Sequence, residues 1–236
     1  GLGQSKMIKH SILIPSYDEF ENLKILVPQI IDTISPNIDS FEIILIDREE
    51  KDIDTYNLAM KYDIRHIQRE GGDRYGDAVR SGIRKARGRT IIFMDADGSH
   101  NPNEILNLCK FSDSFDLVVS SRYLIKSKSE NSFFKELGSK FLNKLCKSLF
   151  KIECTDFSNS FKAYNADILK RVNLYSKDID IIEEIIFKMI KIKGDLSIHE
   201  FPGDFRKRLN YESRRKPFVY LLSYIGTLFR LKFFNK

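Results

Sequence analysis

Short apolar runs alternate along the first half of the chain with longer segments in which apolar residues recur every three or four positions. The short runs have the length and β-branched content of buried strands, and they cover residues 10–15, 41–46, 64–68, 90–94 and 117–120. The periodic segments predict amphipathic helices over about residues 23–34, 56–61 and 75–86, with a further helix opened by Asn101-Pro102. This alternation predicts an α/β fold with a doubly wound, mainly parallel sheet.

The second half of the chain is richer in basic and aromatic residues. Residues 133–151 predict a basic amphipathic helix, which fits either a core helix with a solvated lysine face or a helix lying on a membrane surface. A polar segment over residues 156–163 leads into a short strand, and a helix over 181–192 and a strand over 197–201 follow. The last segment, residues 217–234, is aromatic and amphipathic. We therefore expect one α/β domain followed by an amphipathic C-terminal helix.

The composition and the first residues of the sequence indicate the size of the domain, the redox compartment and the expected native start of the chain. The chain has 236 residues, 42% of them hydrophobic, which is enough to bury a sizeable core in one domain. Its three cysteines show neither a metal-ligand spacing nor a disulfide framework, which favours a reducing compartment. We expect residues 1–6 to be a tag remnant before a native start at Met7, with no signal peptide. No apolar run reaches the roughly 20 residues that a membrane span requires.

The positive charge is concentrated at the C-terminal end. Residues 201–236 contain nine Lys or Arg and two acids, a net charge of +7, against +6 for the whole chain. A basic tail of this kind is either a solvated face or a surface for an anionic partner, such as a phosphate, lipid head groups or nucleic acid. No recognised nucleic-acid-reading motif accompanies it, so we expect no nucleic acid partner.

A pair of carboxylates follows the strand predicted over residues 90–94. In an extended chain Asp95 and Asp97 would point to the same side, with the small Ala96 between them. Two ionised carboxylates suit a hard divalent cation, Mg²⁺ or Mn²⁺, that also binds a phosphate-bearing substrate. A simple polar Asp-Gly turn gives the same short pattern. Pro15 and Asp47 also end predicted strands, and the carboxyl ends of parallel strands form the usual ligand crevice of such a sheet.

Seven features, in order along the chain, match the motifs of one enzyme family. They are the Pro-Ser-Tyr-Asp-Glu-Phe-Glu-Asn-Leu opening at 15–23, Asp47, the glycine segment at 76–82, Asp-Ala-Asp-Gly-Ser-His-Asn-Pro at 95–102, Ser-Ser-Arg-Tyr at 120–123, Asp-Phe-Ser-Asn-Ser-Phe at 156–161, and the 200–214 segment that begins Glu-Phe-Pro. The chain resembles the family 2 glycosyltransferases with the GT-A fold. Within them it is similar to the polyprenyl-phosphate sugar transferases related to dolichol-phosphate mannose synthase. The resemblance covers about residues 9–228.

The resemblance implies one GT-A domain over residues 7–216 and a membrane-associating helix over 217–236. It implies inverting transfer of a mannose- or glucose-like sugar from a nucleoside diphosphate sugar to a polyprenyl or dolichyl phosphate. The donor site so implied places the metal on Asp95, Asp97 and Ser99, with Ala96 beside the donor. The base and ribose would be lined by Pro15, Tyr17, Glu19 and Asp47.

The acceptor half of the implied reaction needs cations rather than a base. A phosphate monoester is already largely ionised at neutral pH, so no catalytic histidine is required and we expect His100 to be structural. The resemblance assigns the acceptor phosphate to Arg122, Arg208, Ser213 and Arg214, and Arg122 and Arg208 join Asp97 as catalytic residues. It also implies a peripheral enzyme on the cytoplasmic face of a membrane, either alone or with a separate membrane-anchoring subunit.

Two alternatives stay open at the level of sequence. The first keeps the donor but transfers to a glycan hydroxyl in cell-surface polysaccharide synthesis, which needs a general base such as Glu183 or Glu184. The second is a non-catalytic nucleotide-sugar-binding relative. Arg48 and Arg74 support the second, because each replaces a residue that the family pattern expects. Arg48 also leaves the choice between a guanine and a uracil donor open.

Overall fold

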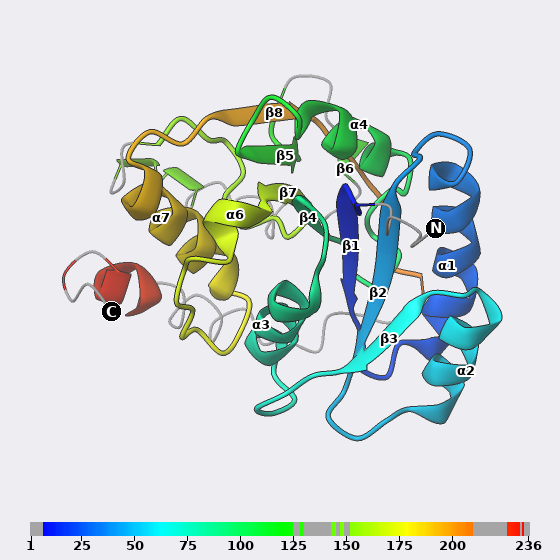
Figure 1. Cartoon of the computed structure of the whole chain (residues 1–236). Coiled ribbons are helices and arrows are strands. Elements are labelled where there is room, and N and C mark those ends of the chain that lie inside the picture. Colours follow the sequence, from blue (N-terminus) through cyan, green and yellow to red (C-terminus); the bar gives the residue numbers. More distant parts are fainter. Residues whose placement is uncertain are drawn as a thin grey trace, which may run out of the picture.

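The protein is described by a computed structural model over residues 7–124, 128–129, 143–144, 147–148, 152–209, 226–231 and 233. The first half contains the strands β1 (His10–Pro15), β2 (Phe41–Asp47), β3 (Arg65–Gln68), β4 (Thr90–Phe93) and β5 (Leu117–Ser121), and the helices α1 (Phe20–Ile34), α2 (Ile53–Lys61), α3 (Tyr75–Lys85) and α4 (Glu104–Phe111). The second half contains β6 (Lys128–Ser129), β7 (Lys162–Asn165), α6 (Ala166–Leu169), α7 (Ile181–Lys193), β8 (Ile198–Pro202) and β9 (Asp204–Phe205). Figure 1 shows these elements in place.

The main sheet has seven strands in the order β3-β2-β1-β4-β7-β5-β8. All neighbouring strands run parallel except β7, which is antiparallel to both β4 and β5. From β1 the chain winds outward through β2 to β3, and then returns to place β4 on the other side of β1. The point where the winding reverses, between β1 and β4, is where doubly wound sheets bind their ligands. The predicted α/β fold class is thus confirmed, with one antiparallel strand in an otherwise parallel sheet.

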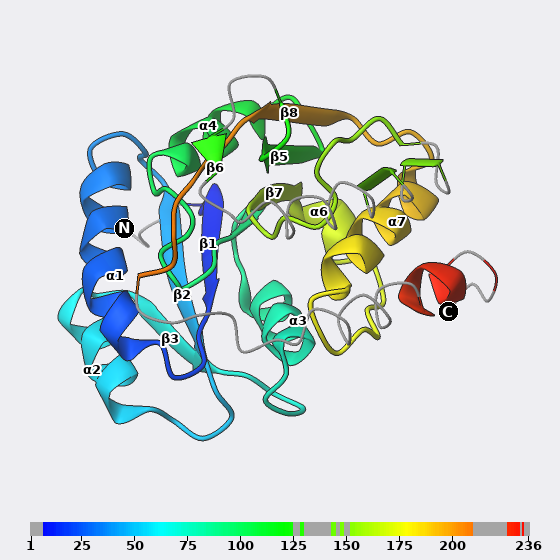
Figure 2. The ribbon, with the colours of Figure 1, turned by 180° about the vertical axis from the view of Figure 1, so that it is seen from behind.

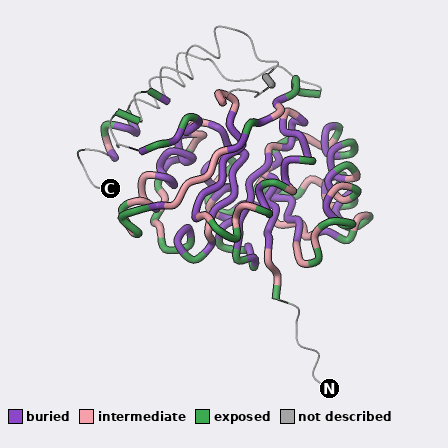
Figure 3. The backbone as a smooth tube through the Cα atoms, turned by 90° about the horizontal axis from the view of Figure 1, so that it is seen from above, coloured by how far each residue is buried: buried purple, intermediate pink, exposed green. Residues whose placement is uncertain are grey.

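Helices cover both faces of the sheet, so the fold has three layers (Figure 1). On one face α3, α6 and α7 pack on residues such as Leu13, Ile46 and Phe93. On the other face α1, α2 and α4 pack on residues such as Ile12, Ile14 and Met94. Neighbouring residues of a strand thus belong to opposite cores, as the pleat requires, which explains why the sequence shows continuous apolar runs rather than alternation. Figure 3 shows the buried strands between the two outer layers.

Close packing of α3 on the sheet depends on a glycine. A Cβ at Gly82 would lie 2.5 Å from Ile46 Cδ1 and 2.9 Å from Leu13 Cδ1, closer than side-chain carbons approach. A larger residue at this position would require the ends of both side chains to move within the packed core.

Part of the predicted C-terminal helix is described. Residues 226–231 are helical, with Leu228 and Leu231 buried and Phe229 exposed. Thr227 Oγ1 donates a hydrogen bond to Asp180 Oδ2 at 2.5 Å, which ties this segment to the loop before α7. The helix predicted over 133–151 lies almost wholly outside the described residues, as do residues 217–225. Within the part of the chain that is described, no helix combines the length and apolar character needed to span a membrane.

Candidate active site

One rim of the sheet collects most of the residues that the sequence singled out. The parallel strands β1, β2, β4, β5 and β8 all end there, and the antiparallel β7 begins there. The loops after β1 and β2 are at the lower side of Figure 1. The same rim thus receives the loop after Pro15, the turn after β4, Arg122 after β5 and the segment after β8. Motifs far apart in sequence meet because strand direction brings them together.

The aspartate pair lies in a turn just beyond β4, which ends at Phe93. Gly98 in this turn has a φ of +79°, a conformation that favours glycine. Asp97 Oδ1 accepts hydrogen bonds from the backbone N–H and the hydroxyl of Ser99, at 3.0 and 2.6 Å. Ala96 and Asp97 form a turn and do not continue β4, so strand alternation does not set the positions of both aspartates.

Arg208 reaches the second oxygen of Asp97. Its Nε lies 2.9 Å from Asp97 Oδ2, with the aspartate side chain 12% exposed and the arginine 46% exposed. Burial acts to raise the pKa of Asp97, but the electrostatic effects of His100 and Arg208 and the hydrogen bonds from Ser99 together outweigh it and lower the pKa below its ordinary value. Asp97 is therefore ionised at neutral pH, as a metal ligand must be.

His100 packs next to the turn that carries Asp95 and Asp97. Its ring stacks on Phe161 at a centroid distance of 4.6 Å and meets Phe205 edge-on at 5.5 Å. Its Nδ1 accepts the backbone N–H of Asp95 at 3.1 Å, and burial lowers its pKa. A neutral ring held in this way is a structural part of the turn, in agreement with the prediction.

The oxygen atoms of the turn fit a hard divalent cation. Asp95, 27% exposed at its side chain, and Asp97 supply carboxylates, and Ser99 supplies a hydroxyl beside them. Among the described residues, no group of three or more His, Cys, Asp or Glu side chains is placed so that it could hold a metal ion by itself. Mg²⁺ and Mn²⁺ take oxygen ligands of the kind that Asp95, Asp97 and Ser99 carry, together with water and substrate phosphate oxygens.

Asp47, predicted to contact the donor, makes its contacts within the protein. Its Oδ1 accepts the backbone N–H of Arg48 at 2.8 Å, and its Oδ2 accepts that of Asp52 at 2.9 Å. His66 Nε2 lies 2.9 Å from the same Oδ2, and both side chains are almost fully buried. Asp47 therefore shapes the loop between β2 and α2.

A buried arginine that the sequence analysis did not single out organises the same rim. Arg69 hydrogen-bonds the backbone carbonyls of Ser16 and Ile46, and those of Asp47, Asp73 and Arg74, and is only 4% exposed. Its guanidinium lies 5.7 Å from the ring centre of Tyr17, which is 40% exposed. Burial lowers the pKa of Arg69. The Tyr17 ring, a predicted donor contact, thus sits against a fixed cationic support.

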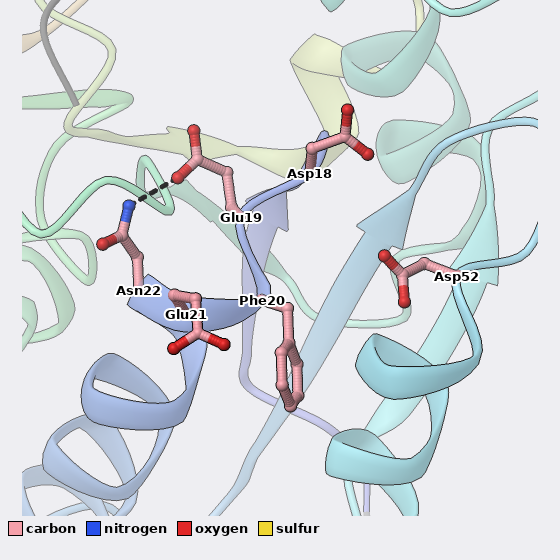
Figure 4. A pocket seen from close by; sticks show the side chains of 6 residues that line it. All are labelled: Asp18, Glu19, Phe20, Glu21, Asn22 and Asp52. Carbon is pink, nitrogen blue, oxygen red and sulfur yellow. Dashed lines mark hydrogen bonds between the residues drawn. The ribbon is translucent and has the colours of Figure 1, made fainter. Parts of the chain in front are cut away.

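A pocket of about 220 Å³ lies beside this rim, at the start of α1 (Figure 4). It is lined by Asp18, Glu19, Phe20, Glu21, Asn22 and Asp52. Glu19 and Asn22 point toward each other and are hydrogen-bonded (Figure 4). Asp18 pairs with Arg48 at 2.8 Å. The structure therefore places Glu19 in the lining of a small acidic pocket, in the chain segment that directly follows Pro15 and Tyr17.

Arg122 forms a two-pronged ion pair with a buried carboxylate. Its Nε donates to Asp156 Oδ2 at 2.9 Å and its Nη2 to Oδ1 at 2.7 Å. Asp156 is fully buried, and Arg122 is 17% exposed at its side chain. Burial acts to raise the pKa of Asp156, but the charge and hydrogen bonds of Arg122 outweigh it and lower the pKa. Glu200, in the Glu-Phe-Pro segment, accepts the backbone N–H groups of Thr155 and Asp156 and so holds this loop in place.

Glu104, a buried carboxylate that belongs to none of the recognised motifs, holds the first residues after β8 in place. Glu104, 6% exposed, accepts the Ser120 hydroxyl and the backbone N–H of Asp204. Asn101 Nδ2 donates to Asp204 Oδ2 at 2.8 Å. Burial raises the pKa of Glu104 to about 7. The hydrogen bonds of Glu104 and Asn101 thereby link residues at or after the carboxyl ends of β4, β5 and β8. Arg208 follows in the chain shortly after this point.

Glu183 and Glu184, the two carboxylates considered as a general base, are both buried on α7. Glu184 is fully buried and accepts the backbone N–H groups of Tyr175 and Ser176, and Lys188 pairs with it at 2.8 Å. Its oxygens therefore brace the loop before α7. Glu183 is buried on the same helix. Ser213 and Arg214, predicted for the acceptor phosphate, lie outside the described residues.

Comparison with known protein families identifies one match over most of the chain. The model described as Glycosyl transferase family 2 matches residues 11–172. A dolichol-phosphate mannosyltransferase of Pyrococcus furiosus is 30% identical over 232 residues, which cover 95% of this chain and 64% of that protein. A polyprenol monophosphomannose synthase of Mycolicibacterium smegmatis is 27% identical, over 84% of this chain and 77% of that protein. The chain thus spans less than two thirds of the length of the Pyrococcus relative.

Solved structures give the same fold. A crystal structure of glucosyl-3-phosphoglycerate synthase from Mycobacterium tuberculosis, in complex with Mn²⁺, uridine diphosphate and glucosyl-3-phosphoglycerate, superposes with a TM-score of 0.71 at 18% identity. It covers 95% of this chain and 80% of that chain. At this identity the likeness supports the architecture alone.

Proposed function

The chain belongs to glycosyl transferase family 2, and we propose that it transfers a sugar from a nucleoside diphosphate sugar to a polyprenyl phosphate, with inversion at the sugar carbon. The observation that carries the proposal is the meeting of Asp97 and Arg208 at one rim of the sheet, with a nitrogen–oxygen distance of 2.9 Å. A carboxylate suits the metal of a bound diphosphate, and arginine suits a phosphate acceptor. The relatives named for dolichol-phosphate and polyprenol-phosphate products support this acceptor class and a mannose-like sugar.

Each half of the site has a distinct task in this proposal. Asp95, Asp97 and Ser99 hold Mg²⁺ or Mn²⁺ against the diphosphate, and Pro15, Tyr17, Glu19, Asp47 and Ala96 shape the pocket for the rest of the donor. The cation, when bound, neutralises the charge that develops on the leaving nucleotide. Arg69 keeps the loop of Tyr17 in place through its carbonyl contacts.

The acceptor phosphate supplies its own nucleophile. Its oxygen is already anionic near neutral pH, so it attacks the sugar carbon from the side opposite the nucleotide without proton removal. Arg122, Arg208, Ser213 and Arg214 hold and orient it in the proposed reaction. Guanidinium contacts orient the phosphate and lower the cost of bringing two anionic substrates together.

Transfer to a glycan hydroxyl is the second candidate, and it needs a carboxylate free to take a proton. Burial acts to raise the pKa of Glu184, but the bonds from Lys188 and Ser176 outweigh it and lower the pKa. A carboxylate committed to these donors is a poor base. Full activity in a Glu183→Gln/Glu184→Gln variant would remove this alternative, and loss of chemistry with an intact fold would favour it.

A lipid acceptor also requires contact with a membrane, and we assign this contact to the C-terminal helix. Phe229 and Phe233 are 60% and 64% exposed, and their rings stack with centroids 5.4 Å apart. Aromatic side chains on a basic amphipathic segment favour the interface of an anionic bilayer. We propose peripheral attachment at the cytoplasmic face, directly or beside a separate anchoring subunit.

The donor half can be tested apart from the acceptor half. A thermal-shift screen of GDP-, UDP- and CDP-sugars with Mg²⁺ or Mn²⁺ should find a nucleotide that stabilises the wild type. The same nucleotide should give no metal-dependent shift with Asp97→Asn. For the acceptor half, labelled sugar should move into a lipid extract when polyprenyl phosphate is present. Lack of transfer with every donor, in the presence of metal, would overturn the proposal.

A further inference from the structure

The segment after β9 lies directly across the aspartate turn. The backbone N–H of Arg206 donates to the carbonyl of Ser99 at 2.9 Å, and that of Leu209 donates to the carbonyl of Asp97 at 3.0 Å. A Cβ at Gly98 would lie 2.5 Å from Leu209 Cγ, so the leucine side chain rests against the glycine. In Figure 2 the segment is the orange chain that leaves β8 and runs down toward the ends of β1 and β2.

Arg208 occupies the carboxylate that a cation would use. Asp97 Oδ1 is engaged by Ser99, and Oδ2 is engaged by Arg208 Nε. A divalent cation and a guanidinium are both attracted to the same Oδ2, and two positive groups that close to one another repel. A cation on Oδ2 therefore weakens the hold of Asp97 on Arg208, and Arg208 in its present position weakens the binding of a cation there.

The anchoring of the segment confines any movement to its outer part. Asp204 is held by Glu104 and Asn101, and Phe205, 5% exposed, packs against the ring of His100. Beyond this point Arg208 and Leu209 are about half exposed, at 46% of the side chain and 45% of the residue. Residues 206–209 can thus leave the aspartate turn while the base of the segment stays in place.

We propose that Arg208 is exchanged between two anions, Asp97 in the metal-free protein and the acceptor phosphate in the reacting one. When a cation and nucleoside diphosphate bind at Asp97, Arg208 leaves the aspartate and becomes a ligand for the acceptor. An acceptor that meets the metal-free enzyme therefore finds Arg208 already paired with Asp97. The inference rests on the proposed function, because it needs an anionic acceptor.

The exchange can be tested by calorimetry with citronellyl phosphate, a short prenyl phosphate, in the presence of EDTA. Asp97→Asn removes the charge that holds Arg208, and it should bind this probe about fivefold more tightly than wild type, the factor a partly exposed ion pair contributes. Asp95→Asn is the matched control, because it removes the same charge two residues away and should give a smaller gain. In Asp97→Asn/Arg208→Ala the gain should vanish.

The outcomes separate the inference from the function on which it rests. If wild type binds citronellyl phosphate equally well with EDTA and with Mg²⁺ plus nucleoside diphosphate, and Asp97→Asn binds it no more tightly, the exchange is wrong while the acceptor class stands. A gain that persists in the double variant also overturns the exchange. If no protein binds the probe under either condition, the proposed acceptor class and the exchange both fail.

A second readout follows the segment itself. The chain contains no tryptophan, so Leu209→Trp places a single reporter on the aspartate turn. Mg²⁺ with the nucleotide that stabilises the protein should change its emission. A reporter at Ile25→Trp, 45% exposed on α1, should stay unchanged. Unchanged emission at position 209, under conditions in which thermal shift shows nucleotide binding, would overturn the release of the segment.

Discussion

Replacing Arg122 with methionine would leave Asp156 as a buried carboxylate without the fork that holds it. The substitution removes the two side-chain bonds to Asp156, at 2.9 and 2.7 Å, and the bond to Ser158 Oγ at 2.8 Å. The bond from the backbone N–H of residue 122 to Asp156 Oδ2, at 2.9 Å, remains. The test therefore removes the charge partner while the loop keeps one of its contacts.

The expected cost follows from burial. Breaking a buried ion pair by removing one partner costs about 3 to 5 kcal/mol. We expect about 3 kcal/mol here, because Arg122 is partly exposed and buried Lys162 also contributes positive charge near Asp156. Asp156→Asn should cost less, on the order of 1 kcal/mol, because the freed arginine can be hydrated. The double variant should show a coupling of about 2 kcal/mol between the two positions.

Urea unfolding followed by circular dichroism measures these values, and pH adds a distinct signature. In wild type the pKa of Asp156 lies below its ordinary value. Removing Arg122 takes away the main causes that lower this pKa, so the folded-state pKa of Asp156 should be higher in the variant than in wild type. The stability that the pair contributes is lost as the carboxyl is protonated, so the loss in Arg122→Met should shrink as pH falls from neutral towards about 3. A coupling under about 0.5 kcal/mol, with no pH trend, would refute the assignment of Arg122 as the charge partner of Asp156.

Three further predictions concern residues that position the site. In the folded protein the pKa of Glu104 is raised from 4.5 to about 7. Between these two pH values the folded state therefore holds a proton that the unfolded state has lost. The free energy of unfolding of wild type should fall by about 3 kcal/mol as pH rises from about 4.5 to about 7. Thermal unfolding of Glu104→Gln over the same pH values should show no such fall. An equal dependence of stability on pH in the two proteins would contradict the raised pKa of Glu104. Gly82→Ala should destabilise by about 1 to 3 kcal/mol through overpacking, whereas Gly226→Ala, with no atom within 4 Å of its added Cβ, should not. Arg69→Met should lower the free energy of unfolding by about 2 kcal/mol or more, because it leaves buried carbonyls unpaired. The control Arg84→Met loses a largely exposed ion pair and should change this free energy by no more than about 0.5 kcal/mol. A similar effect of the two substitutions would contradict the role of Arg69.

The elements of the fold were predictable because each one is written in a local pattern. The strands and helices follow from apolar spacing, and the shared rim follows from strand direction. The aspartate turn was also visible, since Asp95-Ala96-Asp97-Gly98 directly follows a buried strand. Its geometry was not predictable, because the chain turns at Ala96 and Asp97, where extended alternation had been expected.

Contacts between distant segments could not be read from the sequence. The inward bonds of Asp47 depend on His66, and the fork of Arg122 depends on Asp156, which comes 34 residues later. Arg69 belonged to no motif that had been recognised, and only the folded chain shows that it binds five carbonyls. In each case the pairing is decided by tertiary packing, for which spacing along the chain carries no signal.

Sugar transfer to a phosphate is tested most directly with two acceptors that differ only in their phosphate. Wild-type protein is incubated with Mg²⁺, the labelled nucleotide sugar selected by thermal shift, and either a polyprenyl phosphate or the corresponding polyprenol. Label should appear in the lipid extract with the phosphate alone, and it should be lost when EDTA is added or Asp97 is replaced by asparagine. Equal labelling of the polyprenol, or no labelling of either lipid, would contradict the central claim that this site transfers a sugar to a phosphate.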